Sequence, residues 1–575
     1  MSLLDVRGLR VGYEGVEAVK GLDFTLDAGE TLALVGESGC GKSTTALALL
    51  RLLPGNARVT GQALFEGRDL LQLPDRQIRQ LQGNALGMVF QEPLSSLNPV
   101  LTLGEQLAET LLTHTDLSRR QAWQRAEELF GLVKLPRPAA HLREYPQHLS
   151  GGQRQRVMIA MAIACQPRLL IADEPTTALD VCVQAQILEL LDSLRRELNM
   201  GLLLITHDLG VVSQQADRVI IMHDGEALER QPTAELFKHP IHPYTRGLLQ
   251  ASLGREHNQH YLDQRLPEIQ VTRQPGQPNQ YAVSSTRHAP GHEPIPPSLS
   301  VPPLLEVDRL SLGYGERDVL SGLSFNIGAR ETVGLVGESG CGKSTLSKAL
   351  LGLLQPRQGR IAFGGRDISS FSPAEQLKWR GQLQMIFQDP YAALNPRHSV
   401  ETILDRVQRL HSQNDATQRR LDREAMLDAV GLPRNSLNRL PHQFSGGQRQ
   451  RIGIARALIV QPKLVICDEP VSALDVSTQA QILNLLVELR EAFDLSYLFI
   501  SHDLSVVRYF ADRVLVMHDA HIVEQATPHA LWQQPQHSYT QRLLAAIPGS
   551  RQPTIQPPLQ PPLPLASRLS FAVAC

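Results

Sequence analysis

The 575-residue sequence is poor in cysteine, in aromatic residues and in excess charge of either sign. Its six cysteines are scattered and form no CxxC pair, which argues against a disulfide framework and against a zinc ribbon. Lysine and arginine total 56 against 58 acidic residues, so the net charge is −2. That balance excludes a basic nucleic-acid coat protein and an acidic disordered protein, and we expect no nucleic-acid partner.

Long apolar segments are missing as well. The longest apolar runs, such as residues 202–205, fall far below the roughly 18–20 residues that span a bilayer. The first residues, MSLLDVRGLR, contain no apolar core and no small-residue cleavage site, so we expect no secretory signal. These absences predict a cytosolic, reduced protein that reaches a membrane only through partners. At roughly 150 residues per domain, the length predicts three or four domains.

One series of motifs occurs twice along the chain. The stretch LVGESGCGKST recurs after 301 residues, and the motifs SGGQRQR, DEP and HDL each recur after 295 residues, in the same order. We therefore predict a duplicated domain, with copies at residues 3–250 and 304–547. Residues 251–303 carry eight late prolines and balanced charge, which predicts an extended linker. Residues 548–575 are rich in Pro and Gln, which predicts a disordered tail.

Each copy alternates short apolar runs with helical patterns. In the first copy, residues 31–35, 169–172 and 202–205 are predicted strands, and residues 42–53 are a predicted helix. This alternation favours parallel α/β layers. Residues 92–147 break it with a mostly helical pattern, matched by residues 389–443 in the second copy, which predicts an inserted helical subdomain.

The repeated glycine-rich stretch has the pattern of a phosphate-binding P-loop. An apolar strand precedes it and a helix follows it, as that loop requires. Its backbone N–H groups would surround phosphate oxygens, while Lys42 and Lys343 would reach the β- and γ-phosphates. The predicted nucleotide-binding residues are Gly36, Glu37, Ser38, Gly39, Cys40, Gly41, Lys42, Ser43 and Thr44, and in the second copy Gly337, Glu338, Ser339, Gly340, Cys341, Gly342, Lys343, Ser344 and Thr345.

An acidic pair follows a buried strand in each copy. Asp173 and Asp468 suit a Mg²⁺ ion because hard cations take oxygen ligands, while Glu174 and Glu469 suit a general base. Such pairs are more often solvated turn residues, but here each accompanies a P-loop. The predicted catalytic residues are Glu174, Glu469, His207, His502, Gln91 and Gln388, and the predicted metal ligands are Ser43, Asp173, Gln91, Ser344, Asp468 and Gln388.

A second glycine-containing motif opens a helix in each copy. Ser-Gly-Gly at a helix start offers free N–H groups to an anion, although an ordinary N-cap followed by flexible glycines has the same pattern. Two phosphate-binding helix starts in one domain make sense if they serve different nucleotides. The residues concerned are Ser150, Gly151, Gly152 and Gln153, and Ser445, Gly446, Gly447 and Gln448.

P-loop, LSGGQ signature, acidic pair and histidine in this order resemble the ATP-binding cassette (ABC) ATPases. The resemblance implies an α/β fold of tandem P-loop NTPase domains, each a RecA-like α/β core with an inserted α-helical subdomain. It implies ATP and Mg²⁺ as cofactors, and intramolecular pairing in which each P-loop meets the opposite signature. It also implies that Tyr13 and Tyr314 stack on adenine, and that Asp180 and Asp475 lie in loops linking the two sites.

Finer motifs resemble one subfamily. FQEPLSSLNP and HPYTRGLL, with FQDPYAALNPR and HSYTQRLL, are similar to two paralogous ATPase subunits of oligopeptide, dipeptide and nickel importers, here fused in one chain. The resemblance implies two transmembrane permease partners that dock near Gln91 and Gln388, and a periplasmic or extracellular substrate-binding protein. It implies a peripheral position on the cytoplasmic face of the inner membrane. Many members carry a cysteine cluster after HPYT; none follows here, so we expect no iron–sulfur cluster.

Two other functions remain as alternatives. A soluble tandem-cassette translation factor acting on ribosomes would also have two cassettes, but such factors join them with a basic helical linker. A DNA-repair or chromosome ATPase would insert zinc sites or long coiled coils, and neither pattern is present. The sequence therefore favours an ATPase that energises import of peptides or peptide-like solutes, with two hydrolytic sites.

Overall fold

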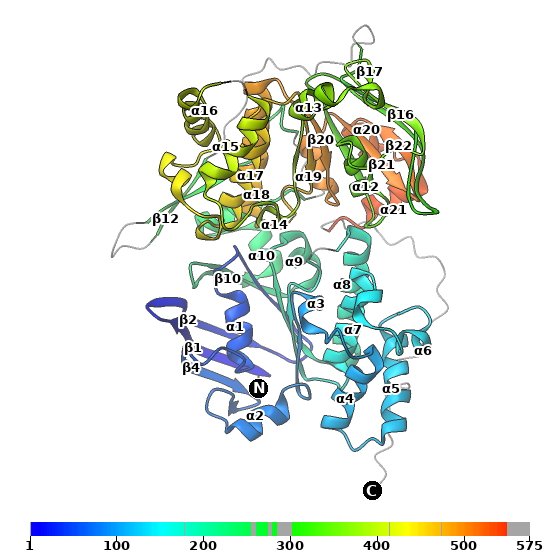
Figure 1. The fold of residues 1–575 in the computed structure, drawn as a ribbon. Coiled ribbons are helices and arrows are strands. Elements are labelled where there is room, and N and C mark those ends of the chain that lie inside the picture. The colour runs from blue at the N-terminus through cyan, green and yellow to red at the C-terminus, as the bar shows by residue number, and fades with distance from the viewer. Residues whose placement is uncertain are drawn as a thin grey trace.

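The computed structural model describes residues 2–177, 179–254, 260–273, 279–284, 302–412, 414–472 and 474–548. Two halves of the same architecture lie one above the other, with the first half below and the second above (Figure 1). Each half has a six-stranded sheet and a four-stranded antiparallel sheet, in equivalent strand orders. The duplication predicted from the sequence is therefore a duplication of the fold.

In the first half the six-stranded order is β10-β9-β3-β8-β7-β6 and the four-stranded order is β2-β1-β4-β5. The strands are β1 (Leu4–Tyr13), β2 (Val16–Leu26), β3 (Thr31–Gly36), β4 (Ala57–Phe65), β5 (Arg68–Asp69), β6 (Leu86–Val89), β7 (Leu169–Asp173), β8 (Gly201–Thr206), β9 (Arg218–His223) and β10 (Glu226–Pro232). The helices are α1 (Lys42–Leu49), α2 (Asp75–Leu81), α3 (Pro93–Ser96), α4 (Leu103–His114), α5 (Arg119–Leu132), α6 (Pro138–His141), α7 (Gly151–Ile163), α8 (Val181–Leu198), α9 (Leu209–Gln215), α10 (Thr233–Lys238) and α11 (Pro243–Ala251).

In the second half the orders are β18-β19-β20-β15-β21-β22 and β14-β13-β16-β17. The strands are β13 (Leu305–Tyr314), β14 (Arg317–Ile327), β15 (Thr332–Gly337), β16 (Gln358–Phe363), β17 (Arg366–Asp367), β18 (Leu383–Ile386), β19 (Leu464–Asp468), β20 (Ser496–Ile500), β21 (Arg513–His518) and β22 (His521–Ala526). The helices are α12 (Lys343–Leu350), α13 (Pro373–Gln382), α14 (Pro390–Ala393), α15 (Val400–His411), α16 (Ala416–Ala429), α17 (Gly446–Leu458), α18 (Val476–Phe493), α19 (Leu504–Phe510), α20 (Pro528–Gln533) and α21 (Ser538–Ala545).

The central strands carry unbroken apolar runs because helices cover both faces of the parallel sheet. All six residues of β3 are buried, and β3 pairs in parallel with both β8 and β9. The predicted strands at residues 31–35, 169–172 and 202–205 are confirmed within a residue or two. The predicted helix at 42–53 is too long: α1 ends at Leu49, and Arg51 takes a left-handed φ of 51° that a helix does not admit.

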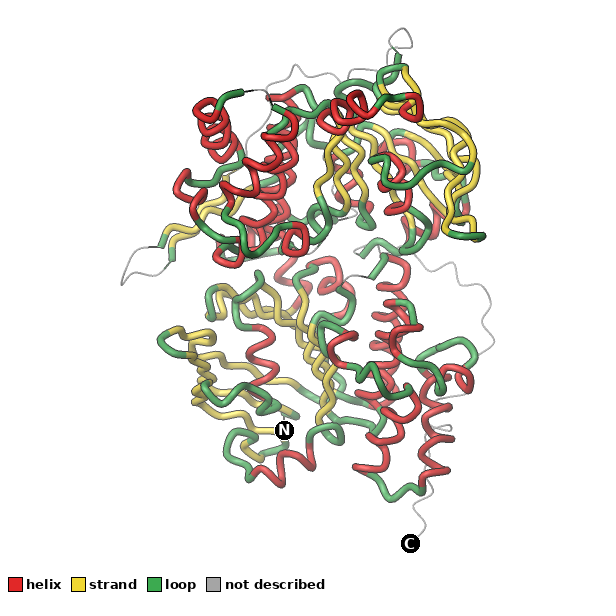
Figure 2. Tube along the Cα trace, viewed as in Figure 1, coloured by secondary structure: helices red, strands yellow, loops and turns green. Residues whose placement is uncertain are grey.

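The inserted segments are helical, as their patterns predict. In Figure 2 the helices of this subdomain gather at the lower right in the first half and at the upper left in the second. Local sequence sets their starts: Thr102 with Glu105, and Ser118 with Gln121, form capping boxes at the first turns of α4 and α5. The opposite placement of the two subdomains means that the halves face one another head to tail.

Part of the predicted linker folds, contrary to its composition. Residues 268–272 and 280–284 form a hairpin, β11 (Glu268–Thr272) with β12 (Gln280–Ser284), and Tyr261 and Leu266 are buried. The segment gains its structure from the surfaces of both halves, which a composition argument about the segment alone does not include. The predicted disorder of the tail concerns residues that lie outside the described part, apart from Pro548.

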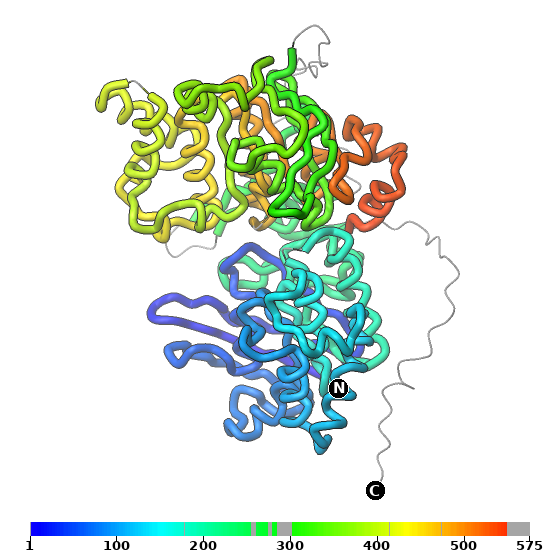
Figure 3. The backbone as a smooth tube through the Cα atoms, turned by 45° about the vertical axis from the view of Figure 1, so that its right-hand side comes forward, coloured from blue at the N-terminus to red at the C-terminus, as the bar shows by residue number. Residues whose placement is uncertain are grey.

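The halves meet through the segments that follow their acidic pairs. Val181 at the start of α8 packs into a core cluster of the second half, and Val476 at the start of α18 packs against a core cluster of the first. Helices α11 and α18 are in contact, as are α21 and α8 (Figure 3). Among the described residues, no helix has the length and hydropathy to cross a membrane.

Candidate active site

Each P-loop is closed by its own lysine. Lys42 is buried, and its Nζ donates to the backbone carbonyls of Gly36 at 2.8 Å and Glu37 at 2.9 Å. Gly41, just before α1, has a φ of 99°, and a Cβ there would lie 2.5 Å from the Ala18 carbonyl oxygen. Only glycine meets both conditions. The loop therefore holds a cation at the N-terminus of a helix, which is an arrangement that binds phosphate.

The first carboxylate of the acidic pair faces this loop. Ser43 Oγ donates to Asp173 Oδ1 over 3.1 Å, so a hydroxyl and a carboxylate oxygen lie side by side. Burial raises the pKa of Asp173, and the charge of Glu174 raises it further. The Ser43 hydroxyl and the Asp173 carboxylate are hard oxygen donors, and the charge of Asp173 is not fully compensated. The pair therefore fits a Mg²⁺ ion.

The predicted catalytic side chains of the first cassette lie around the second carboxylate of the acidic pair, that of Glu174. Gln91 Nε2 donates to Glu174 Oε2 at 2.9 Å, Thr177 Oγ1 donates to the same oxygen at 2.9 Å, and His207 Nδ1 lies 3.4 Å from Oε1. Burial would raise the pKa of Glu174, but the hydrogen bond and charge of His207 lower it to about 2. Glu174 also takes a left-handed φ of 46°, which costs of order 1–3 kcal/mol and is typical of functional positions.

The second half repeats the geometry of the lysine and of the second carboxylate. Lys343 Nζ donates to the carbonyls of Gly337 and Glu338 at 2.7 and 2.8 Å. Glu469 has a φ of 47°, accepts from Gln388 Nε2 at 2.8 Å, and lies 3.0 Å from His502 Nδ1. Both copies therefore hold a complete set of P-loop lysine, acidic pair, glutamine and histidine.

Comparisons with known proteins identify the family. The sequence model of the ABC transporter family matches residues 19–177 and again residues 320–472, and so covers more than half of the chain. The chain belongs to the ABC transporter family. It is an ATPase of two fused cassettes, and each cassette contains one P-loop. A second model, for the C-terminal region of oligopeptide/dipeptide transporters, matches residues 228–276 and 523–569.

Similar proteins span nearly the whole chain. The glutathione import ATP-binding protein GsiA of Salmonella paratyphi A is 45% identical over 568 residues, which cover 95% of this chain and 90% of that protein. GsiA of Escherichia coli K12 is 43% identical over 575 residues, with the same coverage. A solved chain, cbiO1 from Clostridium perfringens, described as part of the ABC transporter complex cbiONQ, is 29% identical with a TM-score of 0.38, covering 40% of this chain and 91% of that one.

The signature motifs stand at helix starts. Ser150 and Ser445 cap α7 and α17 through capping boxes with Gln153 and Gln448, and both serines are exposed. Ser38 of the first P-loop is exposed too. The pairing of each signature with the opposite P-loop stays a prediction for the ATP-bound state.

The two adenine-stacking candidates differ in setting. Tyr314 is 49% exposed and borders a cavity of about 670 Å³ that Ser339 and Gly340 of the second P-loop also line. Tyr13 packs partly buried against the core of the first cassette. Their role in adenine binding remains a prediction.

Some site residues were not predicted from the sequence. Thr177 bonds Glu174, and Tyr539 Oη accepts a hydrogen bond from the Glu338 backbone N–H at 2.9 Å, just behind the second P-loop. The Tyr-Thr pair that recurs at Tyr244 and Tyr539 is the sequence signal that could have indicated these positions. In the structure both tyrosines are fully buried beside a P-loop.

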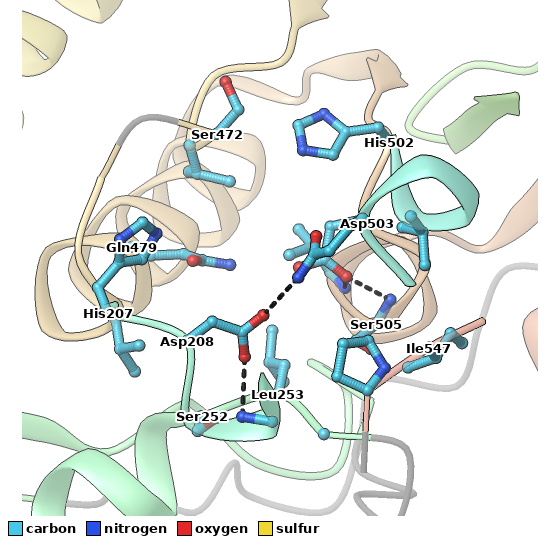
Figure 4. Close-up of a pocket in the computed structure, with 18 of the residues that line it drawn as sticks. His207, Asp208, Ser252, Leu253, Ser472, Gln479, His502, Asp503, Ser505 and Ile547 are labelled. Carbon is cyan, nitrogen blue, oxygen red and sulfur yellow. Dashed lines mark hydrogen bonds between the residues drawn. The ribbon is translucent and has the colours of Figure 1, made fainter. Parts of the chain in front are cut away.

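The two histidines share a cavity between the cassettes. It has a volume of about 150 Å³ and is bordered by His207 and Asp208 from the first cassette and by His502 and Asp503 from the second (Figure 4). Each aspartate caps the helix that follows it, α9 or α19. The two candidate histidines therefore border one small polar space between the cassettes.

Proposed function

We propose that this chain energises the import of glutathione or a related short peptide by hydrolysing ATP at two sites between its cassettes. The observation that carries the substrate class is the similarity to glutathione import proteins at up to 45% identity across both cassettes. The reported relatives lend no support to a ribosomal role. Two permeases, a substrate-binding protein outside the membrane, and a peripheral position on the cytoplasmic face of the inner membrane complete the proposal.

In the first site, Lys42 would exchange its two carbonyl partners for the β- and γ-phosphates. Glu174 is held ionised by His207 and Thr177, so it would accept hydrogen-bond donation from the attacking water. His207 would turn from Glu174 toward the γ-phosphate. Ser43, Asp173 and Gln91 would hold Mg²⁺, which neutralises charge that develops on the phosphates.

The second site would use Lys343, Ser344, Asp468, Glu469, Gln388 and His502 in the same roles. Ser445, Gly447 and Gln448 would complete the first site from the opposite cassette, and Ser150, Gly152 and Gln153 would complete the second. Closure around two ATP molecules and reopening after hydrolysis would drive the permeases.

Exposed apolar side chains support the docking of permeases beside the glutamines. Leu94 and Val100 follow Gln91 and are 60% and 76% exposed, and Tyr391 follows Gln388 and is 54% exposed. Apolar side chains left in water near a protein's own hydrolytic centre favour a protein interface there. Their counterparts would be cytoplasmic helices of the two permeases.

The test is affinity purification of the tagged chain from gently solubilised membranes, followed by uptake assays. We expect two multi-spanning permeases to copurify, and labelled glutathione uptake to stop when Lys42 and Lys343 are both replaced by Ala. Recovery of ribosomal subunits in place of permeases would contradict the proposal. Normal glutathione uptake in cells lacking the chain would contradict the assignment of glutathione as the substrate.

A further inference from the structure

Residues 260–273 and 279–284 contact both cassettes, although their composition predicts a linker. The described part of this segment contacts the second cassette at one end and the first cassette at the other. We call residues 260–273 and 279–284 the strap. Helix α11, which it covers, ends the first cassette, while α18 and α19 belong to the second.

The front of the strap is bound to the second cassette through Asn484. This asparagine lies in the middle of α18 and is 4% exposed. Its Oδ1 accepts from the Leu266 backbone N–H at 3.0 Å, and its Nδ2 donates to the Leu266 carbonyl and to Glu268 Oε1, both at 2.8 Å. Tyr261 Oη adds a 2.6 Å bond to Asp512. A buried asparagine with all these bonds made specifies one position of the strap.

The hairpin of the strap is bound to the first cassette behind its P-loop. Tyr281 Oη lies 2.9 Å from His223 Nδ1, and the other ring nitrogen of His223 lies 4.0 Å from the Glu37 carboxylate. The Tyr281 ring also packs against Tyr244, at 5.5 Å between centroids. Glu37 is a P-loop residue whose carbonyl accepts from Lys42. A continuous set of contacts therefore runs from the strap to the phosphate-binding loop.

The duplicated cassettes show that these surfaces are specialised. The position equivalent to Asn484 in the first cassette is Glu189, which is exposed. The position equivalent to Gly247, on α11, is Arg542 in the second cassette. A Cβ at Gly247 would lie 2.7 Å from Ile269 of the hairpin, so the strap requires glycine there. The cassette fold accepts glutamate at the position of Asn484 and arginine at the position of Gly247, because the opposite cassette has those residues. The asparagine and the glycine therefore adapt these surfaces to the strap.

We propose that the strap makes ATP binding at the first P-loop depend on the second cassette, with Tyr281 and Asn484 as the positioning residues at its two ends. This rests on the proposed assignment of Lys42 and Lys343 to two ATP sites. With the strap bound at both ends, Glu37 and its loop are preorganised for phosphate. Releasing either end loosens the first loop and leaves the second P-loop unchanged, so the two ATP sites are not equivalent.

The test measures binding of a fluorescent ATP analogue, mant-ATP, to the full chain. Lys343→Ala disables the second site, so that only the first site binds nucleotide, and we call this the first-site background. Lys42→Ala disables the first site and gives the second-site background. In the first-site background we expect Tyr281→Phe and Asn484→Asp each to raise the Kd about three- to tenfold. In the second-site background the Kd should stay within twofold. Glu189→Gln, at the equivalent exposed position, is the matched control and should change neither Kd.

The outcomes separate the strap from the assignment of the sites. Binding of two mant-ATP per wild-type chain and one per lysine variant upholds the sites. If that holds while Tyr281→Phe leaves the first-site Kd unchanged, or raises both Kd values equally, the strap proposal is wrong. If Asn484→Asp does not fold, Gly247→Arg, which copies the second cassette, displaces the hairpin instead and must raise only the first-site Kd.

Discussion

Gln388 donates a hydrogen bond from Nε2 to Oε2 of Glu469 over 2.8 Å. The same bond joins Gln91 to Glu174 in the other cassette, at 2.9 Å. Each glutamine follows a strand of the nucleotide-binding core and precedes the segment with exposed apolar side chains. The candidate base is thus held by the residue that begins the proposed permease-docking surface, which gives docking a direct route to the site of hydrolysis.

Replacing either glutamine should therefore weaken hydrolysis and its stimulation by permeases. We expect Gln388→Ala to lower the rate of ATP hydrolysis at the second site about tenfold, since one hydrogen bond to a charged group contributes roughly 1.5 kcal/mol, and so to lower the kcat of the whole chain by close to half. Stimulation in proteoliposomes with the permeases should fall further than the basal rate. Gln384→Ala is the control, because Gln384 donates to the Arg380 carbonyl and not to Glu469. Equal kcat in both variants would contradict the coupling.

The histidine–glutamate pair predicts a pH-dependent contribution to stability. Burial would lower the pKa of His207, but Glu174 raises it above 6.5, while that of Glu174 falls to about 2. The stabilisation is complete between the unfolded values of 4.5 and 6.5. It is lost as rising pH deprotonates His207 and as falling pH protonates Glu174.

We expect His207→Gln to reduce the free energy of unfolding of the nucleotide-free protein by of order 1 kcal/mol near pH 6. The reduction should be smaller at pH 9, because rising pH deprotonates His207 and removes the charged pair. Denaturant unfolding followed by circular dichroism at both pH values measures it. The exposed His239, replaced by Gln, is the control. A loss that does not change with pH would rule out the charged pair.

Ionised Asp468 should lower the stability of the nucleotide-free protein, although the proposed Mg²⁺ site requires it. Burial, together with the charge of Glu469, raises the pKa of Asp468 to about 6 from 3.8. The unfolded chain ionises this group first, so the folded state loses stability as pH rises from about 4 to 6 and carries the full cost above that.

Asp468→Asn should therefore raise the Tm of the nucleotide-free protein at pH 8, by a few degrees, and raise it less at pH 5. The same variant should lose Mg²⁺-dependent ATPase activity at its site. Asp519→Asn, at a carboxylate that is 89% exposed, serves as the comparison in calorimetry. A lower Tm for Asp468→Asn at pH 8 would contradict this, since it would show that other groups compensate the charge of Asp468 in the absence of Mg²⁺.

Much of the fold and site followed from the sequence because both depend on local patterns that occur twice. The strands before Gly36 and Asp173 are apolar runs, and Lys42 and Glu174 follow them at fixed spacing, so parallel pairing brings them together. The head-to-tail orientation of the cassettes came from family resemblance and not from any single pattern.

What the sequence did not predict depends on contacts between distant segments. The strap has a linker's composition, and contacts with both cassettes, among them the surfaces of α11 and α18, order it. No sequence pattern indicates a role for Thr177, which bonds Glu174. The left-handed φ of Glu174 and Glu469 is equally invisible in the sequence, because glutamate carries no preference for it.

The central claim is that both cassettes hydrolyse ATP, with Glu174 and Glu469 as the two bases. The most direct measurement is steady-state ATP turnover of the purified full chain as wild type, Glu174→Gln and Glu469→Gln, with mant-ATP binding to confirm that both sites stay occupied. The account predicts that each single variant keeps two bound nucleotides and loses about half of the wild-type turnover, because general-base catalysis supplies roughly 10²–10⁴-fold at each site and the altered site then contributes almost nothing. Wild-type turnover in either variant would contradict it and leave one cassette without a hydrolytic role.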